Sequence, residues 1–424
     1  MAGVGPLTNT LAQALYKEKV RDVIPALYEA DVSFCNMIEK REAERIGPRG
    51  MRIPKKLRPA GLVRTWEPDG GDLGRGSGAQ YEYAQVTTLP LLVAFESSRA
   101  AQWNTQSSDI AAKNAVQDML KDATNEYKAQ YDRYLFGDST GVMGTVASGG
   151  TGTTPVFTSP IGTRWLRAGQ KYTVYPTGLG APLGTVAVES VDAPNRQITI
   201  TATVGGTSSS GDKYLPEGCL GASPTWIYGT AYHVSSSASG LWMGMARASF
   251  PQIRSIQVDA GSGALVPAHF RLVKNRLSLF RDQAFGKGRW LWVWSPAQRH
   301  AYEDLAQLVN VIQKQSNERK GIDMLYNPDQ FEVDGMATFA SSNQNPSRID
   351  LLNLDTWFRV ETVPLGMYSV DEVSTFPIYG ASGGIAASEV SYLASMTQVC
   401  VDDPGLNAYI SSLALPVGYS EFGT

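Results

Sequence analysis

The sequence predicts an α+β protein built from several parts, and three observations carry this prediction. A long amphipathic segment spans residues 108–136, short β-branched runs fill residues 162–222, and a Gly-rich turn separates two β-like runs between residues 50 and 97. The 424 residues suffice for two to four domains with a buried core. No segment repeats with a fixed period, which argues against a solenoid.

The composition excludes several classes of protein. Hydrophobic residues make up 43% and charged residues 18% of the chain, as in a globular protein. The 37 basic and 40 acidic residues give a net charge of −3, whereas a dedicated nucleic-acid-binding protein carries a basic face and a high pI. No apolar run approaches the roughly 18 residues of a membrane span, so no membrane contact is expected.

The three cysteines, Cys35, Cys219 and Cys400, lie far apart in the sequence. Their odd number and the absence of a CxxC pair indicate neither a disulfide framework nor a zinc site. The N-terminus has no basic segment followed by an apolar run, so no signal peptide is expected. Synthesis and folding in a reducing cytoplasm fit both observations.

The first hundred residues predict an arm followed by a projecting hairpin. Residues 1–48 contain irregular helical pieces, and residues 49–100 contain two β-like limbs around the turn "DGGDLGRGSGAQ". Pro54, Pro59 and Pro90 keep both limbs from being central strands of a sheet. Because an isolated two-stranded ribbon is marginally stable in water, we expect this hairpin to rest on something outside its own domain.

A long helix is predicted over residues 108–136. Ser107 or Ser108 can cap its first turn, and apolar residues form one stripe along it. Gly137 stands where a left-handed residue commonly ends a helix, and the polar residues 138–141 predict a turn into a strand.

The rest of the chain predicts a small β unit and then mixed α and β structure. Short β-branched runs parted by Gly, Pro and Asn indicate a self-contained all-β insertion at 162–223. Further along, Pro267 begins a predicted helix, "RWLWVW" predicts a buried strand, and Pro296 begins another helix.

The sequence offers little for catalysis. Its histidines, His233, His269 and His300, have no second ligand at metal spacing. Ser382 in "GASGG" matches the nucleophile elbow, but no histidine follows it as the elbow requires. The stretch "FGKGR" lacks the spacing of a phosphate-binding loop. We therefore expect no enzyme activity and no catalytic, cofactor-binding or metal-binding residue.

A basic stretch on the first limb of the hairpin is the other candidate site. It contains Arg49, Arg52, Lys55, Lys56 and Arg58. Two interpretations stay open for these side chains: contact with nucleic acid or an acidic neighbouring subunit, and simple solvation of an exposed limb.

The order of these parts resembles that of the major capsid proteins of tailed bacteriophages, which have the Hong Kong 97 type fold. The arm, the hairpin and a long helix ending in "YDRYLFGDSTGVMGTVAS" come first. The later segments "WLWVWSPAQRHAYEDLAQL", "RIDLLNLDTWFRVE" and "QVCVDDPGLNAYISSL" resemble elements of the axial and peripheral domains of such proteins. The resemblance implies an N-terminal arm (1–48), an extended hairpin loop (49–100), a peripheral domain with a spine helix (101–161), a β-rich insertion domain (162–223), an axial domain (224–365) and a C-terminal return to the peripheral domain (366–424).

The resemblance also implies a function. Pentamers and hexamers of the chain would tile an icosahedral shell in the virion, around double-stranded DNA that is enclosed without specific binding. The hairpin would lie on a neighbouring subunit and contact it through the tip residues Asp69, Gly70, Gly71, Asp72, Leu73, Gly74, Arg75, Gly76, Ser77 and Gly78. A portal and a cement protein are further implied partners. Fewer than 50 residues precede the hairpin, so we expect any scaffolding protein to be a separate chain.

Two alternatives remain. An encapsulin-like nanocompartment shell protein would enclose a protein cargo instead of DNA, so the contents of the particles discriminate between them. A β-rich tail or adhesion protein of the virion is suggested by the nine tryptophans and the β unit at 162–222. However, Trp290, Trp292 and Trp294 stand in one apolar run and are expected to be core residues, not an exposed platform for glycans.

Overall fold

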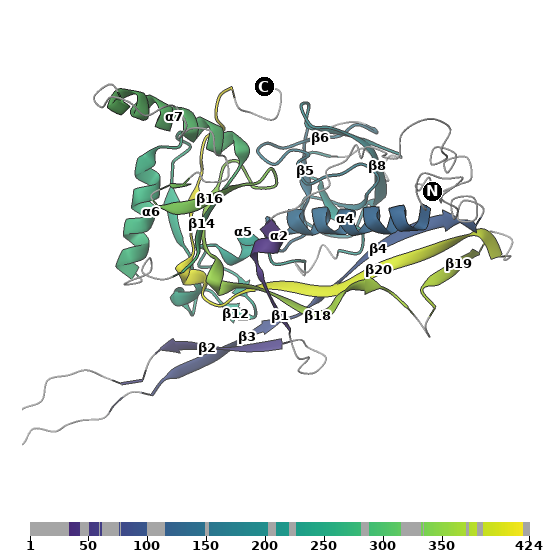
Figure 1. Ribbon diagram of the computed structural model, residues 1–424, viewed down its shortest axis with the longest axis horizontal. Helices are drawn as coiled ribbons and strands as arrows, with labels where there is room; N and C mark the ends of the chain where they lie inside the picture. The colour runs from purple at the N-terminus through teal and green to yellow at the C-terminus, as the bar shows by residue number, and fades with distance from the viewer. Residues whose placement is uncertain are drawn as a thin grey trace, which may run out of the picture.

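The chain folds into a five-stranded sheet, a six-stranded sheet, a closed barrel and a projecting two-stranded ribbon (Figure 1). The structure is a computed structural model. It describes residues 34–42, 51–58, 60–61, 76, 78–99, 115–148, 152–201, 209–219, 226–280, 288–314, 332–333, 335–369, 373–379 and 385–418. The predicted α+β class is confirmed.

The first sheet has five strands and is covered on one face by a long helix. Its order is β1-β18-β20-β19, and β4 pairs with β20. The strands are β1 (Glu39–Glu42), β4 (Leu89–Ser98), β18 (Trp357–Met367), β19 (Thr375–Tyr379) and β20 (Ile385–Val401). Among the described strands β4 pairs only with β20, so Pro90 lies on an edge strand, as predicted.

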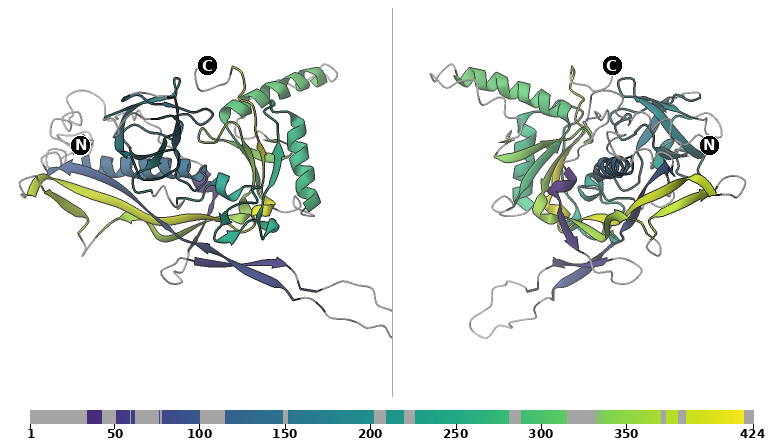
Figure 2. Two further views of the ribbon diagram at one scale, coloured as in Figure 1. Left: turned by 180° about the vertical axis from the view of Figure 1, so that it is seen from behind. Right: turned by 45° about the vertical axis from the view of Figure 1, so that its right-hand side comes forward.

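Helix α4 (Ala115–Leu135) lies between this sheet and the barrel, as both views in Figure 2 show. Toward the sheet, the Tyr127 hydroxyl is 2.5 Å from Ser395 Oγ, and Tyr131 is buried. The predicted helix is thus confirmed over 115–135, and the start predicted at residue 108 lies outside the described residues.

The end of α4 differs from the prediction at Gly137. The left-handed residues are Ser139 (φ 73°) and Gly141 (φ 76°), and Gly137 is not among them. The helix ends in a tighter turn instead, because the backbone N–H of Gly137 donates to the Tyr134 carbonyl oxygen, three residues back. The chain then reverses in a turn in which Asp138 Oδ1 accepts a hydrogen bond from the backbone N–H of Thr140.

The barrel is closed in the order β10-β5-β6-β9-β8-β7. Its strands are β5 (Gly144–Ser148), β6 (Val156–Phe157), β7 (Lys171–Tyr175), β8 (Gly184–Asp192), β9 (Gln197–Ile200) and β10 (Lys213–Pro216). Two of these strands precede residue 162, where the sequence placed the start of the insertion. Strands of five and two residues are too short to show a period-two pattern, which explains the difference.

The second sheet has six strands in the order β13-β21-β17-β14-β16-β15. They are β13 (Ile256–Asp259), β14 (Trp290–Trp294), β15 (Glu332–Val333), β16 (Met336–Ala340), β17 (Ile349–Asn353) and β21 (Ala408–Ser411). Helices α6 (Pro267–Phe280) and α7 (Pro296–Lys314) begin at the predicted prolines and lie beside this sheet (Figure 1). All five residues of β14 are buried, so its tryptophans are core residues, as predicted.

Two elements cross the predicted domain boundaries. Strand β21 was expected in the C-terminal part of the peripheral domain, but it pairs with β13 and β17 in the six-stranded sheet. Strand β18 begins within the predicted axial segment, but it pairs with β20 in the five-stranded sheet. Both assignments depend on pairing between residues far apart in sequence, which local patterns do not encode.

Short elements complete the structure. They are α2 (Phe34–Met37), β2 (Met51–Arg58), β3 (Gln80–Val86), α5 (Thr230–His233), β11 (Leu241–Trp242), β12 (Met245–Ala246) and the 3-10 turns η2 (Pro251–Ile253), η5 (Leu354–Thr356) and η6 (Pro404–Leu406).

Candidate functional site

Among the strands of the described residues, β2 and β3 pair only with each other, and they form the ribbon, which lies beyond the five-stranded sheet (Figures 1 and 2). Their antiparallel register runs from Met51 opposite Val86 to Arg58 opposite Gln80. The predicted hairpin is confirmed over these residues. Pro54 is tolerated here because each strand of a two-stranded ribbon has a free edge.

The inner face of the ribbon base packs on the body of the same chain. Ile53, Ala84 and Val86 belong to one apolar cluster with residues from 242–253, β18 and β20. The remaining members of that cluster are Trp242, Met243, Met245, Ile253, Phe358, Val360 and Cys400. The base is therefore folded onto its own protomer before any partner is present.

Two polar contacts fasten the same base. Lys55 Nζ lies 2.9 Å from Asp402 Oδ1 and donates to the Asp402 carbonyl oxygen at 2.8 Å. The backbone N–H of Gln85 donates to the Met243 carbonyl oxygen at 2.8 Å. Lys55, one of the predicted contacts for a neighbour or nucleic acid, is thus engaged within its own chain, and its side chain is only 12% exposed.

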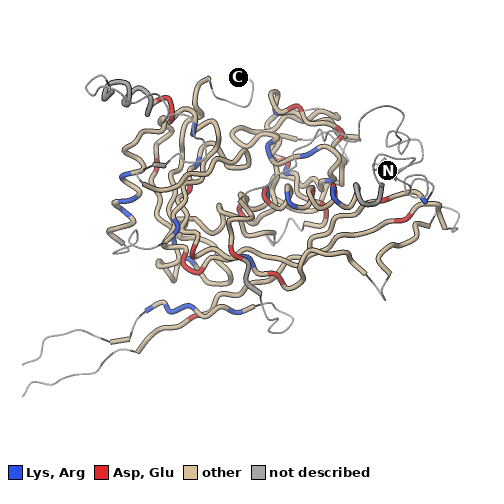
Figure 3. Tube along the Cα trace, viewed as in Figure 1, with Lys and Arg blue, Asp and Glu red and all other residues tan. Residues whose placement is uncertain are grey.

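The outer face of the ribbon carries three of the other predicted basic residues. Arg52, Lys56 and Arg58 are exposed because they alternate with the inward side chains of β2, and Figure 3 shows this concentration of positive charge. Tyr81 and Tyr83 are 64% and 49% exposed on the paired strand. Arg49 lies outside the described residues.

The exposed tyrosines were not among the predicted site residues. Their spacing in "QYEYAQV" was the available signal, since residues two apart in a strand share a face. The guanidinium carbon of Arg52 lies 4.7 Å from the centre of the Tyr83 ring. The outer face therefore combines positive charge with aromatic surface, a composition found where proteins contact partners.

Most of the predicted hairpin tip, Asp69 to Arg75 and Ser77, lies outside the described residues, as does Ser382. Gly76 and Gly78 are described and exposed, and an added Cβ at either would meet no atom within 4 Å. Contact between the tip and a neighbouring subunit stays a prediction.

The described end of the predicted arm belongs to the body of the protein. Phe34 is fully buried, with its ring 5.2 Å from that of Phe136 and 6.0 Å from that of Phe339. Strand β1 then pairs in parallel with β18. Residues 1–33 of the predicted arm lie outside the described residues.

His233 is a buried structural residue beside the ribbon base. Trp242 Nε1–H donates to its Nδ1 at 3.0 Å, which leaves Nε2–H to donate to the Val399 carbonyl oxygen at 3.1 Å. Burial lowers the pKa of His233 to about 3, and the positive charges of Arg247 and Lys55 act in the same direction. The imidazole is therefore neutral in the folded protein and holds Trp242 under the ribbon.

The burial of neutral His233 predicts that acid lowers the stability of the folded protein. Below about pH 6.5 the unfolded chain binds a proton at His233 that the folded chain does not, so the free energy of unfolding falls as the pH falls toward about 3. Relative to His233→Gln, wild type should lose about 1.4 kcal/mol more per pH unit across this range. Urea unfolding of both proteins between pH 7 and pH 4 measures the difference, and parallel pH profiles would contradict the assignment.

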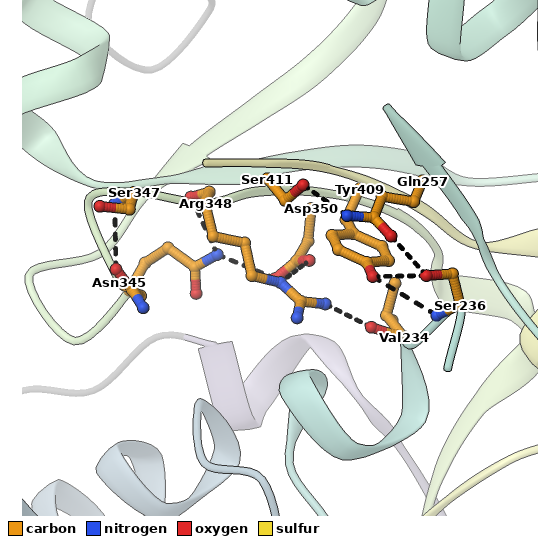
Figure 4. A network of polar contacts seen from close by, with 10 residues as sticks. Val234, Ser236, Gln257, Asn345, Ser347, Arg348, Asp350, Tyr409 and Ser411 are labelled. Atoms are coloured by element: carbon orange, nitrogen blue, oxygen red, sulfur yellow. Dashed lines mark hydrogen bonds and ion pairs between the residues drawn. The ribbon is translucent and has the colours of Figure 1, made fainter. Parts of the chain in front are cut away.

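A polar network joins the six-stranded sheet to the segment after α5 (Figure 4). Asp350, which is fully buried, accepts from Arg348 Nε at 2.6 Å and from Gln344 Nε2 at 2.8 Å. Arg348 also donates to the Val234 carbonyl oxygen, and its guanidinium carbon lies 4.2 Å from the centre of the Tyr409 ring. The ion pair positions the Arg348 guanidinium, whose hydrogen bond to Val234 joins the start of β17 to the segment after α5.

The network continues from Tyr409 to the edge strand of the same sheet. The Tyr409 hydroxyl is 2.9 Å from Ser236 Oγ, which donates to Gln257 Oε1 at 2.5 Å. Gln257 Nε2 donates to Ser411 Oγ at 2.7 Å. These partners come from three separate stretches of sequence, and no motif or spacing signalled their meeting.

The two buried cysteines, Cys219 and Cys400, are unsuited to act as nucleophiles. Burial raises the pKa of the Cys219 thiol to about 12 and raises that of Cys400 further, which disfavours a thiolate at either. Within the described ranges no group of three or more His, Cys, Asp or Glu residues could hold a metal ion. The helices of the described part include none that is both long and apolar enough to cross a membrane.

No protein-family model matches the sequence, and no curated protein sequence is similar to it. Among solved structures, the chain is similar to a chain of the cyanophage A-1(L) capsid, with a TM-score of 0.55 and 11% identity over 96% of this chain and 98% of that one. It is also similar to the capsid of a native GTA particle, with a TM-score of 0.50 and 9% identity over 97% of this chain and 100% of that one. The chain therefore has the fold of phage capsid proteins, as the sequence resemblance implied.

Proposed function

We propose that this chain is the major capsid protein of a tailed double-stranded DNA bacteriophage. Copies of it would assemble as pentamers and hexamers into the icosahedral shell of the virion. The observation that carries the proposal is the ribbon of β2 and β3, which is fastened to its own body at the base and presents an exposed outer face. The shared fold with capsid proteins supports the same conclusion.

The ribbon supports assembly because its two strands have no further strand partner in the described part of the chain. A two-stranded ribbon is marginal in water unless other surfaces cover it. Its exposed face belongs to one part of the molecule and would dock on a different part of the next copy. Such head-to-tail contacts form closed rings when the rotation closes, which is what pentamers and hexamers need.

The charge of the chain fits a container for DNA. Tight binding of DNA requires many cationic contacts to phosphates, and the net charge of −3 provides no such excess. DNA would therefore be enclosed without specific binding. A separate scaffolding protein, a portal and a cement protein are the further partners of this proposal.

The experiment is to express the full chain, with a co-encoded scaffolding chain if one accompanies it, and to image the sedimenting material by electron microscopy. Closed shells of uniform diameter are expected, with double-stranded DNA inside the particles purified from infected cells. A chain that stays monomeric at high concentration, with and without the scaffolding chain, would contradict the proposal. Particles filled with a protein cargo would replace it with a nanocompartment function.

A further inference from the structure

The barrel shares its apolar core with the rest of the molecule. Barrel residues such as Val174 and Ile198 belong to the same buried cluster as Tyr131 of α4 and as Leu291 and Leu352 of the six-stranded sheet. The sequence indicated a self-contained unit, whereas a continuous core makes the barrel part of the main body. One apolar cluster therefore links the inserted barrel, helix α4 and part of the six-stranded sheet.

On the helix side, one carboxylate binds the segment that leads into the barrel strand β7. Glu126 Oε1, in the middle of α4, accepts from Gln170 Nε2 at 3.0 Å. Glu126 Oε2 lies 3.1 Å from Arg167 Nη2, and the two side chains of this pair are only 20% and 13% exposed. Because two donors of the segment bind one largely buried carboxylate, they fix the orientation of the segment relative to α4 as well as its distance from the helix.

On the sheet side, the same segment binds the loop 341–344 that follows β16. Trp165 Nε1–H donates to the Asn343 carbonyl oxygen at 2.8 Å, and Arg164 donates to the Ser342 carbonyl oxygen. Trp165 is 6% exposed, so its hydrogen bond is shielded from water. The loop is thereby fixed to the barrel.

A third contact closes the triangle between helix, barrel and loop. Asn343 Nδ2 donates to Asp132 Oδ2 on α4 at 3.0 Å, and the other oxygen of Asp132 accepts from the backbone N–H of Cys35 at 3.2 Å. Asp132 and Asn343 are both buried. Three mutually bonded parts resist rotation about any one of their contacts, because each contact is backed by two others.

We propose that the inserted barrel is a brace that fixes the angle between helix α4 and the six-stranded sheet, and that this angle sets the curvature of the assembled shell. The second half of this inference rests on the proposed function. A subunit used in both pentamers and hexamers bends slightly between them, and the stiffness of its joint limits how many curvatures the shell adopts. An insertion that only added stability would change the unfolding midpoint and leave the curvature unchanged.

The test is the double variant Glu126→Gln/Trp165→Phe, which removes the ion pair and the indole donor; Glu126→Gln keeps the shape of the side chain, whereas Trp165→Phe keeps an aromatic ring of smaller volume. The matched control is Glu189→Gln, an identical change at an exposed position on the barrel strand β8. Hydrogen exchange at the amide of Gln344, which donates to the Ser341 carbonyl oxygen, reports on the loop. Exchange there should become about tenfold faster in the double variant and stay unchanged in the control.

The diameters of assembled particles provide the second measurement. The double variant should form shells of several diameters, whereas wild type and Glu189→Gln form shells of one diameter. Unchanged exchange at Gln344 would overturn the brace, and faster exchange with a single diameter would overturn its link to curvature. If wild type formed no shells at all, the proposed function would fail, while the exchange measurement would still decide whether the barrel is a brace.

Discussion

Replacing residues 59–79 with a two-residue Asn-Gly turn is expected to give a folded protomer that no longer forms shells. Strands β2 and β3 end at Arg58 and begin at Gln80, so the short turn can close the remaining ribbon. The contacts at the base, including the Lys55–Asp402 ion pair, stay in place. The variant keeps the outer face of both strands and removes the segment beyond them, which would carry the contact of the hairpin tip with a neighbouring copy. Sedimentation velocity and electron microscopy of the purified variant measure the loss of particles.

A second loop exchange controls for the removal of chain. Residues 177–183 connect the barrel strands β7 and β8 and take no part in the ribbon. Replacing them with Asn-Gly should leave assembly intact. The melting temperature of the ribbon variant should stay close to that of the wild-type chain, whereas that of the control should fall because the control loses Leu179, which packs against the core. Normal shells from the ribbon variant would show that the hairpin is dispensable and would remove the main support for the proposed assembly.

The substitution Asp350→Ala is expected to lower the free energy of unfolding by about 3 kcal/mol, the scale of breaking one side of a buried ion pair. Asp350 is fully buried, and its loss leaves the Arg348 guanidinium, 17% exposed, without its carboxylate. The Gln344 amide loses the same acceptor. Urea unfolding of the wild type and the variant measures the change.

The matched double variant Arg348→Met/Asp350→Leu separates charge pairing from simple packing. Because it removes both charges and keeps most of the volume, it should be clearly more stable than Asp350→Ala. If the double variant lost as much stability as the single one, the loss would come from changed packing, and the unpaired charge of Arg348 would not be its cause.

Much of the fold could be predicted from local sequence patterns. Proline at a first helical position placed the starts of α6 and α7, and the run of apolar residues at 290–294 placed a buried strand. The glycine-rich turn with strand-like flanks placed the ribbon. Each of these signals lies within a few residues of the element that it predicts.

The strand predictions that differ from the structure have one cause in common, which is that local sequence patterns do not encode the partners of short elements. Strands β5 and β6 belong to the barrel because of partners more than 40 residues away, and β21 pairs with β13, in which Ile256 lies opposite Ala408, and with β17, in which Ile349 lies opposite Ile410. Four-residue strands carry too little periodicity to identify their sheet. Gly137 was predicted to be left-handed because it follows the last helical residue, but the helix first tightens there and the left-handed residues come at Ser139 and Gly141.

The candidate site was predicted in part. The basic residues of β2 were visible in the sequence, but only the alternation of a real strand shows that Lys55 points inward to Asp402 while Arg52 and Lys56 point outward. His233 could not be assigned from sequence, since its partners Trp242 and Val399 meet it only in the folded chain.

One measurement decides most directly whether the ribbon exists to be covered by another copy: a cryo-electron microscopy reconstruction of the assembled particle at side-chain resolution. We expect the outer face that carries Tyr81 and Tyr83, which are 64% and 49% exposed in the single chain, to be buried beneath a neighbouring copy. A reconstruction in which these two rings still face solvent, or in which the hairpin folds back along its own subunit, would contradict the proposal that the ribbon docks on another copy.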